Sequence, residues 1–162
     1  MKVVDANVLL YAVNESAERH DEAVRWLDAA LNGRSTVGFS WISLLAFLRL
    51  STKIGLFPAP LTVEQAVDRT RAWLSQPTSV LLEPTAQHLD VLGGLLTSLG
   101  SGGNLTNDAH LAALAIEHRG EVVTYDSDFG RFPGVAWSTP GALEIPRQEG
   151  RPVEGISTDE VQ

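Results

Sequence analysis

The sequence contains no cysteine, and this absence alone excludes several kinds of chemistry. Disulfide bonds, thiolate zinc sites and cysteine nucleophiles are impossible, and the absence is compatible with a reducing compartment. No stretch reaches the roughly 18 apolar residues that a membrane-spanning helix requires. Met1 leads directly into a short apolar strand, with no apolar signal segment before it. We therefore expect a cytoplasmic protein that does not associate with a membrane.

Basic residues are also scarce, because 12 lysines and arginines stand against 20 aspartates and glutamates, for a formal net charge of -8. This balance argues against broad electrostatic binding to nucleic acid, for which lysine and arginine supply most of the affinity. An acidic surface suits a basic protein partner, and clustered carboxylates suit divalent cations. Charge alone does not decide between these two uses.

The length of 162 residues and the apolar content of 44% fit one globular domain with a real core. Apolar runs predict strands at 3–4, 36–39, 80–82 and 122–123. Helical patterns lie between them, at 8–13, 18–31, 41–51, 62–76, 85–99 and 104–118. Ser40 could cap helix 41–51, and Thr62 begins helix 62–76 with Glu64 and Gln65 behind it, a loose capping arrangement. Strands separated by helices predict a short, mostly parallel sheet with helices on both faces. We expect residues 1–143 to form this domain and residues 144–162 to form a polar, disordered tail.

Four aspartates stand at the ends of separate predicted elements. Asp5 follows the first strand, Asp126 and Asp128 follow the fourth, and Asp108 lies in the first turn of helix 104–118. Ligands of open α/β sheets bind at the carboxyl ends of the strands, and a buried carboxylate is costly unless paired or metal-bound. Hard oxygen ligands suit Mg²⁺ or Mn²⁺. Together the acids predict a metal site.

Each acid taken alone also has a structural explanation. Asp5 or Asn7 could cap the first helix, the helix dipole favours Asp108, and an acidic turn can be an ordinary polar loop. Their joint placement favours the metal site.

The four histidines show no metal-ligand spacing. Six basic residues are candidates for phosphate contacts, each individually weak: Arg49, Lys53, Arg69, Arg71, Arg119 and Arg131.

Three segments, in order, resemble the PIN domain and more narrowly the VapC ribonuclease toxins of bacterial toxin–antitoxin pairs: Val4–Ala12, Asn104–Ala115 and Thr124–Phe129. The resemblance covers residues 1–143 and implies a three-layer α/β/α PIN-like fold. It also implies a Mg²⁺-dependent endoribonuclease, in which Mn²⁺ can substitute, acting on an RNA substrate and held inactive by a VapB-type antitoxin. Together with the strongly apolar helices 41–51 and 85–99, it predicts a homodimer.

The resemblance assigns roles residue by residue. Asp5, Asp108 and Asp126 match the acids that hold the metal and carry catalysis. Asp128 matches a neighbouring acid with a less uniform role. Asn7 would orient Asp5 or a metal-bound water, and Thr124 occupies the hydroxyl position before the third acid.

One position departs from the family pattern, because Ala46 stands where a glutamate is usual. No register shift restores the acid, since residues 29–63 contain no aspartate or glutamate. The alternative is therefore a PIN-like binding module with impaired or absent catalysis. Two other acidic α/β families fit less well. A haloacid dehalogenase phosphatase needs Asp-x-Asp where this chain has Asp5-Ala6-Asn7, and a receiver domain gives no reason for Asp108 on a late helix.

Overall fold

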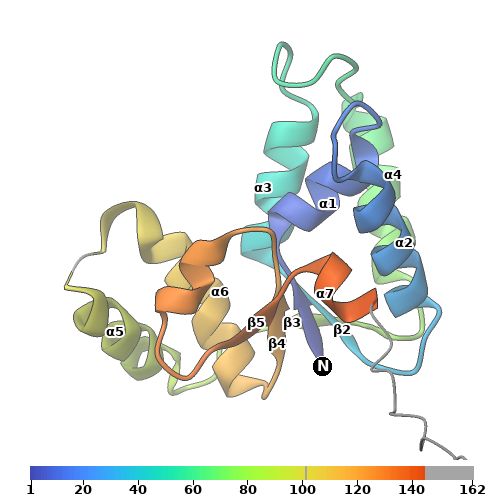
Figure 1. Ribbon diagram of the computed structural model, residues 1–162. Coiled ribbons are helices and arrows are strands. Elements are labelled where there is room, and N and C mark those ends of the chain that lie inside the picture. The colour runs from blue at the N-terminus through green and yellow to red at the C-terminus, as the bar shows by residue number, and fades with distance from the viewer. Residues whose placement is uncertain (101, 145–162) are drawn as a thin grey trace, which may run out of the picture.

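A five-stranded, fully parallel sheet forms the centre of the computed structural model, which describes residues 1–100 and 102–144. Figure 1 shows the sheet among the helices, and its strand order is β3-β2-β1-β4-β5. The strands are β1 (Lys2–Val4), β2 (Val37–Ser40), β3 (Ser79–Leu82), β4 (Glu121–Val123) and β5 (Ala136–Ser138). In the register, Val4 lies opposite Val123. The carboxyl ends of β1 and β4 are therefore neighbours, although 119 residues separate them in the sequence.

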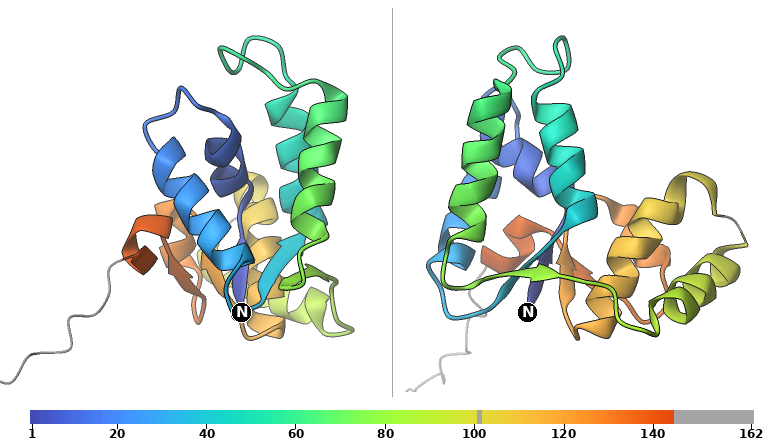
Figure 2. Two further views of the ribbon diagram at one scale, coloured as in Figure 1. Left: turned by 90° about the vertical axis from the view of Figure 1, so that its right-hand side faces the viewer. Right: turned by 180° about the vertical axis from the view of Figure 1, so that it is seen from behind.

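Within residues 1–100 and 102–144, seven α-helices and two short 3₁₀ helices surround the sheet. The α-helices are α1 (Ala6–Val13), α2 (His20–Leu31), α3 (Trp41–Ser51), α4 (Val63–Leu74), α5 (His88–Leu99), α6 (Thr106–Glu117) and α7 (Pro140–Glu144). The 3₁₀ helices are η1 (Gly103–Leu105) and η2 (Ser127–Arg131). Figure 2 shows α3 and α4 side by side, while α5 and α6 form a separate hairpin away from them.

The two faces of the sheet belong to two distinct core clusters. Because side chains alternate along a strand, Val4 and Val123 pack with α1 to α4, while Val3 and Val122 pack with α5, α6 and η2. The sheet is thus the middle of three layers, which confirms the predicted α/β/α arrangement. Within the described residues, no helix combines the length and the apolar character that crossing a membrane requires.

Several local predictions are confirmed in atomic detail. Ser40 caps α3, because its Oγ accepts the backbone N–H of Ser43 at 3.3 Å. Thr62 and Gln65 form a reciprocal capping box at the start of α4. Helix boundaries shift where local turns intervene: α1 starts at Ala6 because Asp5 caps it, and η1 replaces the expected first turn of α6.

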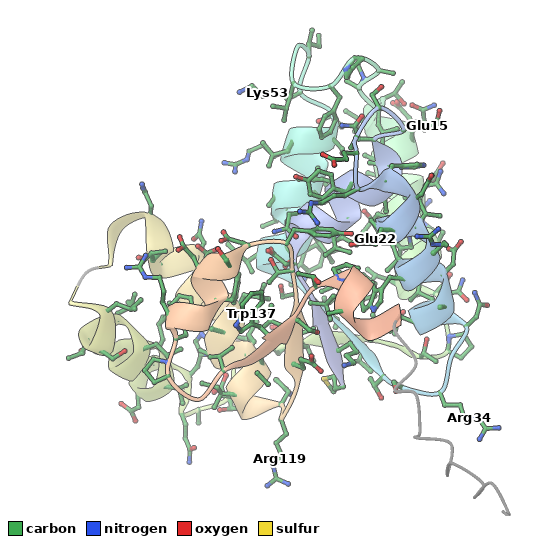
Figure 3. The ribbon with its side chains drawn as sticks, viewed as in Figure 1. Glu15, Glu22, Arg34, Lys53, Arg119 and Trp137 are labelled. Atoms are coloured by element: carbon green, nitrogen blue, oxygen red, sulfur yellow. The ribbon has the colours of Figure 1, made fainter. Side chains whose placement is uncertain are left out.

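Three elements were not predicted: η2, β5 and α7. The helices η2 and α7 have five residues each, which is too short for an apolar period to show. In β5 the one large apolar residue is Trp137, which Figure 3 labels. Its indole ring lies next to Gly130 of η2. The expected tail begins at residue 144, and its residues 145–162 lie outside the described part of the chain.

Candidate metal centre

One cleft of about 400 Å³ opens at the carboxyl ends of β1 and β4, between α1, α3 and α6. Asp5, Asp108 and Asp126 all line it. They come from the end of β1, the first turn of α6 and the loop after β4. The structure therefore brings together the three acids that the sequence predicted as metal ligands. Asn7 and Ala46 also line the cleft, whereas Asp128 does not.

Asp5 is held by three hydrogen bonds. Its Oδ1 accepts the backbone N–H of Ala6 at 2.6 Å, which makes it the N-cap of α1. Its Oδ2 accepts from Nδ2 of Asn7 at 2.8 Å and from Oγ1 of Thr124 at 2.7 Å. Since each carboxylate oxygen has about two acceptor positions, Oδ2 is filled and Oδ1 retains one. The capping role and a ligand role are therefore compatible.

The hydroxyl of Thr124 uses its whole hydrogen-bonding capacity. It is fully buried, donates to Asp5, and accepts from Nδ2 of Asn7 and from the backbone N–H of Asp126, both at 2.9 Å. Asn7 in turn accepts the backbone N–H of Tyr125 at 3.2 Å. Both N–H groups of the Asn7 side chain are thus engaged, so this side chain orients Asp5 and links the ends of β1 and β4.

Asp126 caps η2, because its Oδ1 accepts the backbone N–H of Asp128 at 2.8 Å. The side chain of Asp128 points elsewhere: it is half exposed and lies 3.6 Å from the guanidinium of Arg131. Through its backbone, Asp128 holds Asp126, while its carboxylate contributes negative potential near Asp108.

The acids of the cleft share a negative electrostatic field, which shows in their pKa values. Burial raises the pKa of Asp108 to about 6, and the charges of Asp5, Asp126 and Asp128 add to the rise. Burial also raises the pKa of Asp5, against the lowering effect of the hydrogen bonds from Thr124 and Ala6. A neighbouring cation would stabilise the ionised form of these carboxylates and so lower their raised pKa values.

The donor set fits a hard divalent cation. Among the described residues, no three acid or imidazole groups lie close enough to form a ready-made cage. Mg²⁺ does not require one, since it usually keeps several waters and binds through one or two carboxylates. Three carboxylates facing an open cleft suit that mode of binding.

Helix α3 forms the wall opposite the acids, and it is mostly apolar. Its cleft-lining residues are Ile42, Ser43, Leu45, Ala46, Arg49 and Leu50. The hydroxyl of Ser43 is bonded to Oγ of Ser40 at 3.0 Å. Ala46 thus faces the acids, as expected for the position of the missing glutamate, and α3 offers the cleft no carboxylate.

The structure also contains a second polar cluster, which the sequence did not predict. Nδ1 of His88 lies 2.6 Å from Glu117, and its Nε2 lies 2.8 Å from Nδ1 of His110. The sequence contained no indication of this contact between two histidines, although the prediction concerned metal-ligand spacing and not contact. Spacing along one helix could not reveal the contact, because it forms only where α5 packs on α6. No metal cage results among the described residues.

Comparison with known proteins identifies the family to which this chain belongs. The model of the PIN domain matches residues 2–135. A protein named Ribonuclease VapC37, from Mycobacterium tuberculosis, is 59% identical over 143 residues, covering 88% of this chain and 99% of the relative. This chain belongs to the VapC group of the PIN-domain family.

Two solved structures share the PIN fold of this VapC chain. VapBC2 from Rickettsia felis, bound to a DNA fragment from its promoter, aligns with a TM-score of 0.63 and 22% identity, over 85% of this chain and 97% of the other. VapBC-1 from nontypeable Haemophilus influenzae aligns with a TM-score of 0.61 and 19% identity, over 86% and 98%. At these identities the likeness concerns the fold.

Proposed function

We propose that this protein is a metal-dependent endoribonuclease toxin of a toxin–antitoxin pair. The observation that carries the proposal is the convergence of Asp5, Asp108 and Asp126 in one cleft, from three separate elements. A relative named as a ribonuclease, 59% identical over nearly its whole length, supports the same activity.

Asp5, Asp108 and Asp126 would hold the cation, with Mg²⁺ as the expected metal and Mn²⁺ as a substitute. Asp5 would bind through Oδ1, the oxygen with an acceptor position left. When bound, a divalent cation supplies Lewis acidity toward the phosphate and makes a water more acidic. Asn7 and Thr124 keep the Asp5 carboxylate oriented, and the backbone of Asp128 does the same for Asp126. Water is the expected nucleophile, because the chain has no cysteine and Ser43 is bonded to Ser40.

A VapB-type antitoxin is the proposed partner. The structural neighbours from Rickettsia felis and Haemophilus influenzae are VapBC assemblies. In this chain, an acidic cleft would accept an arginine of the antitoxin, since guanidinium and carboxylate form strong charge-assisted hydrogen bonds. The cytoplasmic location expected from the sequence stays a prediction.

A homodimer is part of the same proposal. Large apolar side chains stand exposed on α3 and α5, among other elements: Trp41 is 48% and Leu45 is 56% exposed on α3, and Leu89 is 77% exposed on α5. Exposed apolar patches on folded domains commonly mark protein interfaces. A second copy covering α3 and α5 would remove these side chains from water.

The alternative of a binding module without catalysis is not favoured, because the three acids are assembled despite Ala46 and the relative carries a ribonuclease name. A direct test incubates the purified protein with total bacterial RNA in Mg²⁺, in Mn²⁺ and in EDTA, and maps the new RNA ends by sequencing. The matched control is Asp108→Asn, which keeps shape but removes charge. We expect metal-dependent cleavage by the wild type alone; equal activity of folded Asp108→Asn would refute the assignment.

A further inference from the structure

Of the six basic residues that the sequence offered as phosphate contacts, Arg49 alone lines the cleft. Arg71 is bonded to Asp68, and Arg131 faces Asp128. Figure 3 shows Lys53 on the loop beyond α3, and Arg119 at the opposite end of the molecule, just before β4 begins. Arg69 is exposed on α4, which does not line the cleft. Arg49 thus differs from the other five basic candidates in its position at the cleft.

Arg49 reaches the cleft through the helical repeat of α3. Ile42, Ala46 and Arg49 follow one another at steps of four and three residues, so they share the face that looks toward the acids. Within the described part of the chain, the guanidinium of Arg49 has no hydrogen bond or ion pair. Its side chain is exposed at the cleft wall, and its donors are available to a ligand.

The charges in the cleft give this arginine a role. Three carboxylates line it, and a phosphodiester entering it adds further negative charge. One divalent cation balances two of the carboxylates, and the neighbouring α3 wall contributes no acid that would call for a second cation. A guanidinium on that wall supplies the remaining positive charge, and its planar fork matches two phosphate oxygens.

The helix dipole offers a second explanation for a basic residue at this position. Arg49 lies in the last turn of α3, where the dipole favours any cation. That effect needs only charge, and lysine would serve equally well. It also gives no reason for the side chain to line the acidic cleft instead of the outer surface of α3.

We propose that Arg49 binds an RNA phosphate next to the one that is cleaved, as the protein's own cationic partner to a single bound metal ion. This inference rests on the proposed ribonuclease function. It makes Arg49 a substrate-binding residue: its guanidinium holds the RNA backbone across the cleft from Asp5, Asp108 and Asp126.

The test measures RNA affinity without cleavage, in an Asp108→Asn background with Mg²⁺ present. The probe is a fluorescein-labelled, random-sequence RNA oligonucleotide, followed by fluorescence anisotropy over a range of KCl concentrations. Adding Arg49→Gln should weaken binding about tenfold, the effect of one lost charge-assisted hydrogen-bonded contact. It should also reduce the slope of log affinity against log salt by about 0.7, the value for one phosphate of a single strand. Arg69→Gln, the matched control on α4, should change neither quantity.

A second measurement uses the otherwise wild-type protein, with folding checked by circular dichroism. Arg49→Gln should raise KM for RNA cleavage while the number of Mn²⁺ ions bound, counted by electron paramagnetic resonance, stays at one. Arg49→Lys should recover part of the affinity, because it restores charge without the planar fork. The inference would be overturned if Arg49→Gln behaved like Arg69→Gln, or if the protein bound two Mn²⁺ ions. In either case, cleavage of RNA by the wild type would still support the proposed function. A loss of antitoxin affinity with unchanged RNA affinity would also overturn it. A wild type that cleaves no RNA would refute the proposed function itself.

Discussion

Oγ1 of Thr124 donates a hydrogen bond of 2.7 Å to Oδ2 of Asp5, joining two residues that lie 119 positions apart. The same hydroxyl accepts from Asn7 and from the backbone of Asp126. One buried side chain therefore fixes the position of two of the three acids in the cleft.

Replacing Thr124 by valine keeps the shape and removes the hydroxyl, so Asn7 and Asp126 each lose an acceptor. We expect Thr124→Val to lower the free energy of unfolding by about 1–3 kcal/mol, the usual cost of unsatisfied buried polar groups. Metal affinity should fall about 10- to 100-fold, as for other partners that orient ligands. Urea denaturation and Mn²⁺ titration measure the two effects. Thr124→Ser is the control, and equal losses in both variants would contradict this account.

The raised pKa of Asp108 predicts how stability depends on pH without metal. The pKa of this carboxyl rises from 3.8 to about 6 on folding, so between these values the folded state binds more protons than the unfolded state. Stability should therefore fall as pH rises through this range, and the penalty should be complete above it. Burial of Asp5 acts in the same direction.

Asp108→Asn removes that titration. In EDTA we expect the variant to be more stable than the wild type at pH 7 and to lose the advantage near the unfolded pKa of 3.8. Mg²⁺ should reverse the order at pH 7, because the cation stabilises only a folded state that can bind it. Urea denaturation at a series of pH values, with and without Mg²⁺, supplies the comparison. Parallel pH profiles for the two proteins would show that Asp108 does not carry the effect.

Ala46→Glu should restore an acid to the α3 wall and lower the Mg²⁺ concentration needed for half-maximal cleavage. Without metal, the variant should melt at a lower temperature, since an unpaired, partly buried carboxylate is costly. Mg²⁺ should restore its stability. Ala72→Glu, on the exposed side of α4, is the matched control and should show no such dependence. If Mg²⁺ rescues neither stability nor activity of Ala46→Glu, position 46 does not serve the metal.

Light scattering should report twice the chain mass of 17.5 kDa if the exposed apolar residues of α3 and α5 form a dimer interface. Leu89→Lys and Trp41→Lys should shift the protein toward the monomer, because a charge at an apolar interface is left without a partner. Ile54→Lys, in the loop after α3, should leave the mass unchanged although Ile54 is 90% exposed. A wild-type monomer throughout the micromolar range would contradict the dimer.

What could be predicted from the sequence follows a physical division. Asp5, Asp108 and Asp126 were found because strand ends and helix starts are local signals, and parallel strands align their carboxyl ends at one edge. Ser40 and Thr62 were found for the same reason, since caps act within one turn.

What could not be predicted depends on contacts between distant segments. Nothing near His88 in the sequence indicates that it meets His110. Arg49 could be separated from the other basic residues only once α3 had been placed against the acids. The sequence could therefore predict which residues are chemically suited to the site. Which way their side chains point became known only from the fold.

The pairing of β1 with β4 has a consequence for the order of events during synthesis. Asp5 leaves the ribosome first, but the threonine and the third acid that complete its surroundings follow more than a hundred residues later. A nascent chain that ends before residue 121 lacks β4, so its Asp5 has no Thr124 hydroxyl to orient it. The cleft is thus assembled late in translation. An RNA-cleaving protein built in this order would carry no organised site while most of its own messenger is still being read.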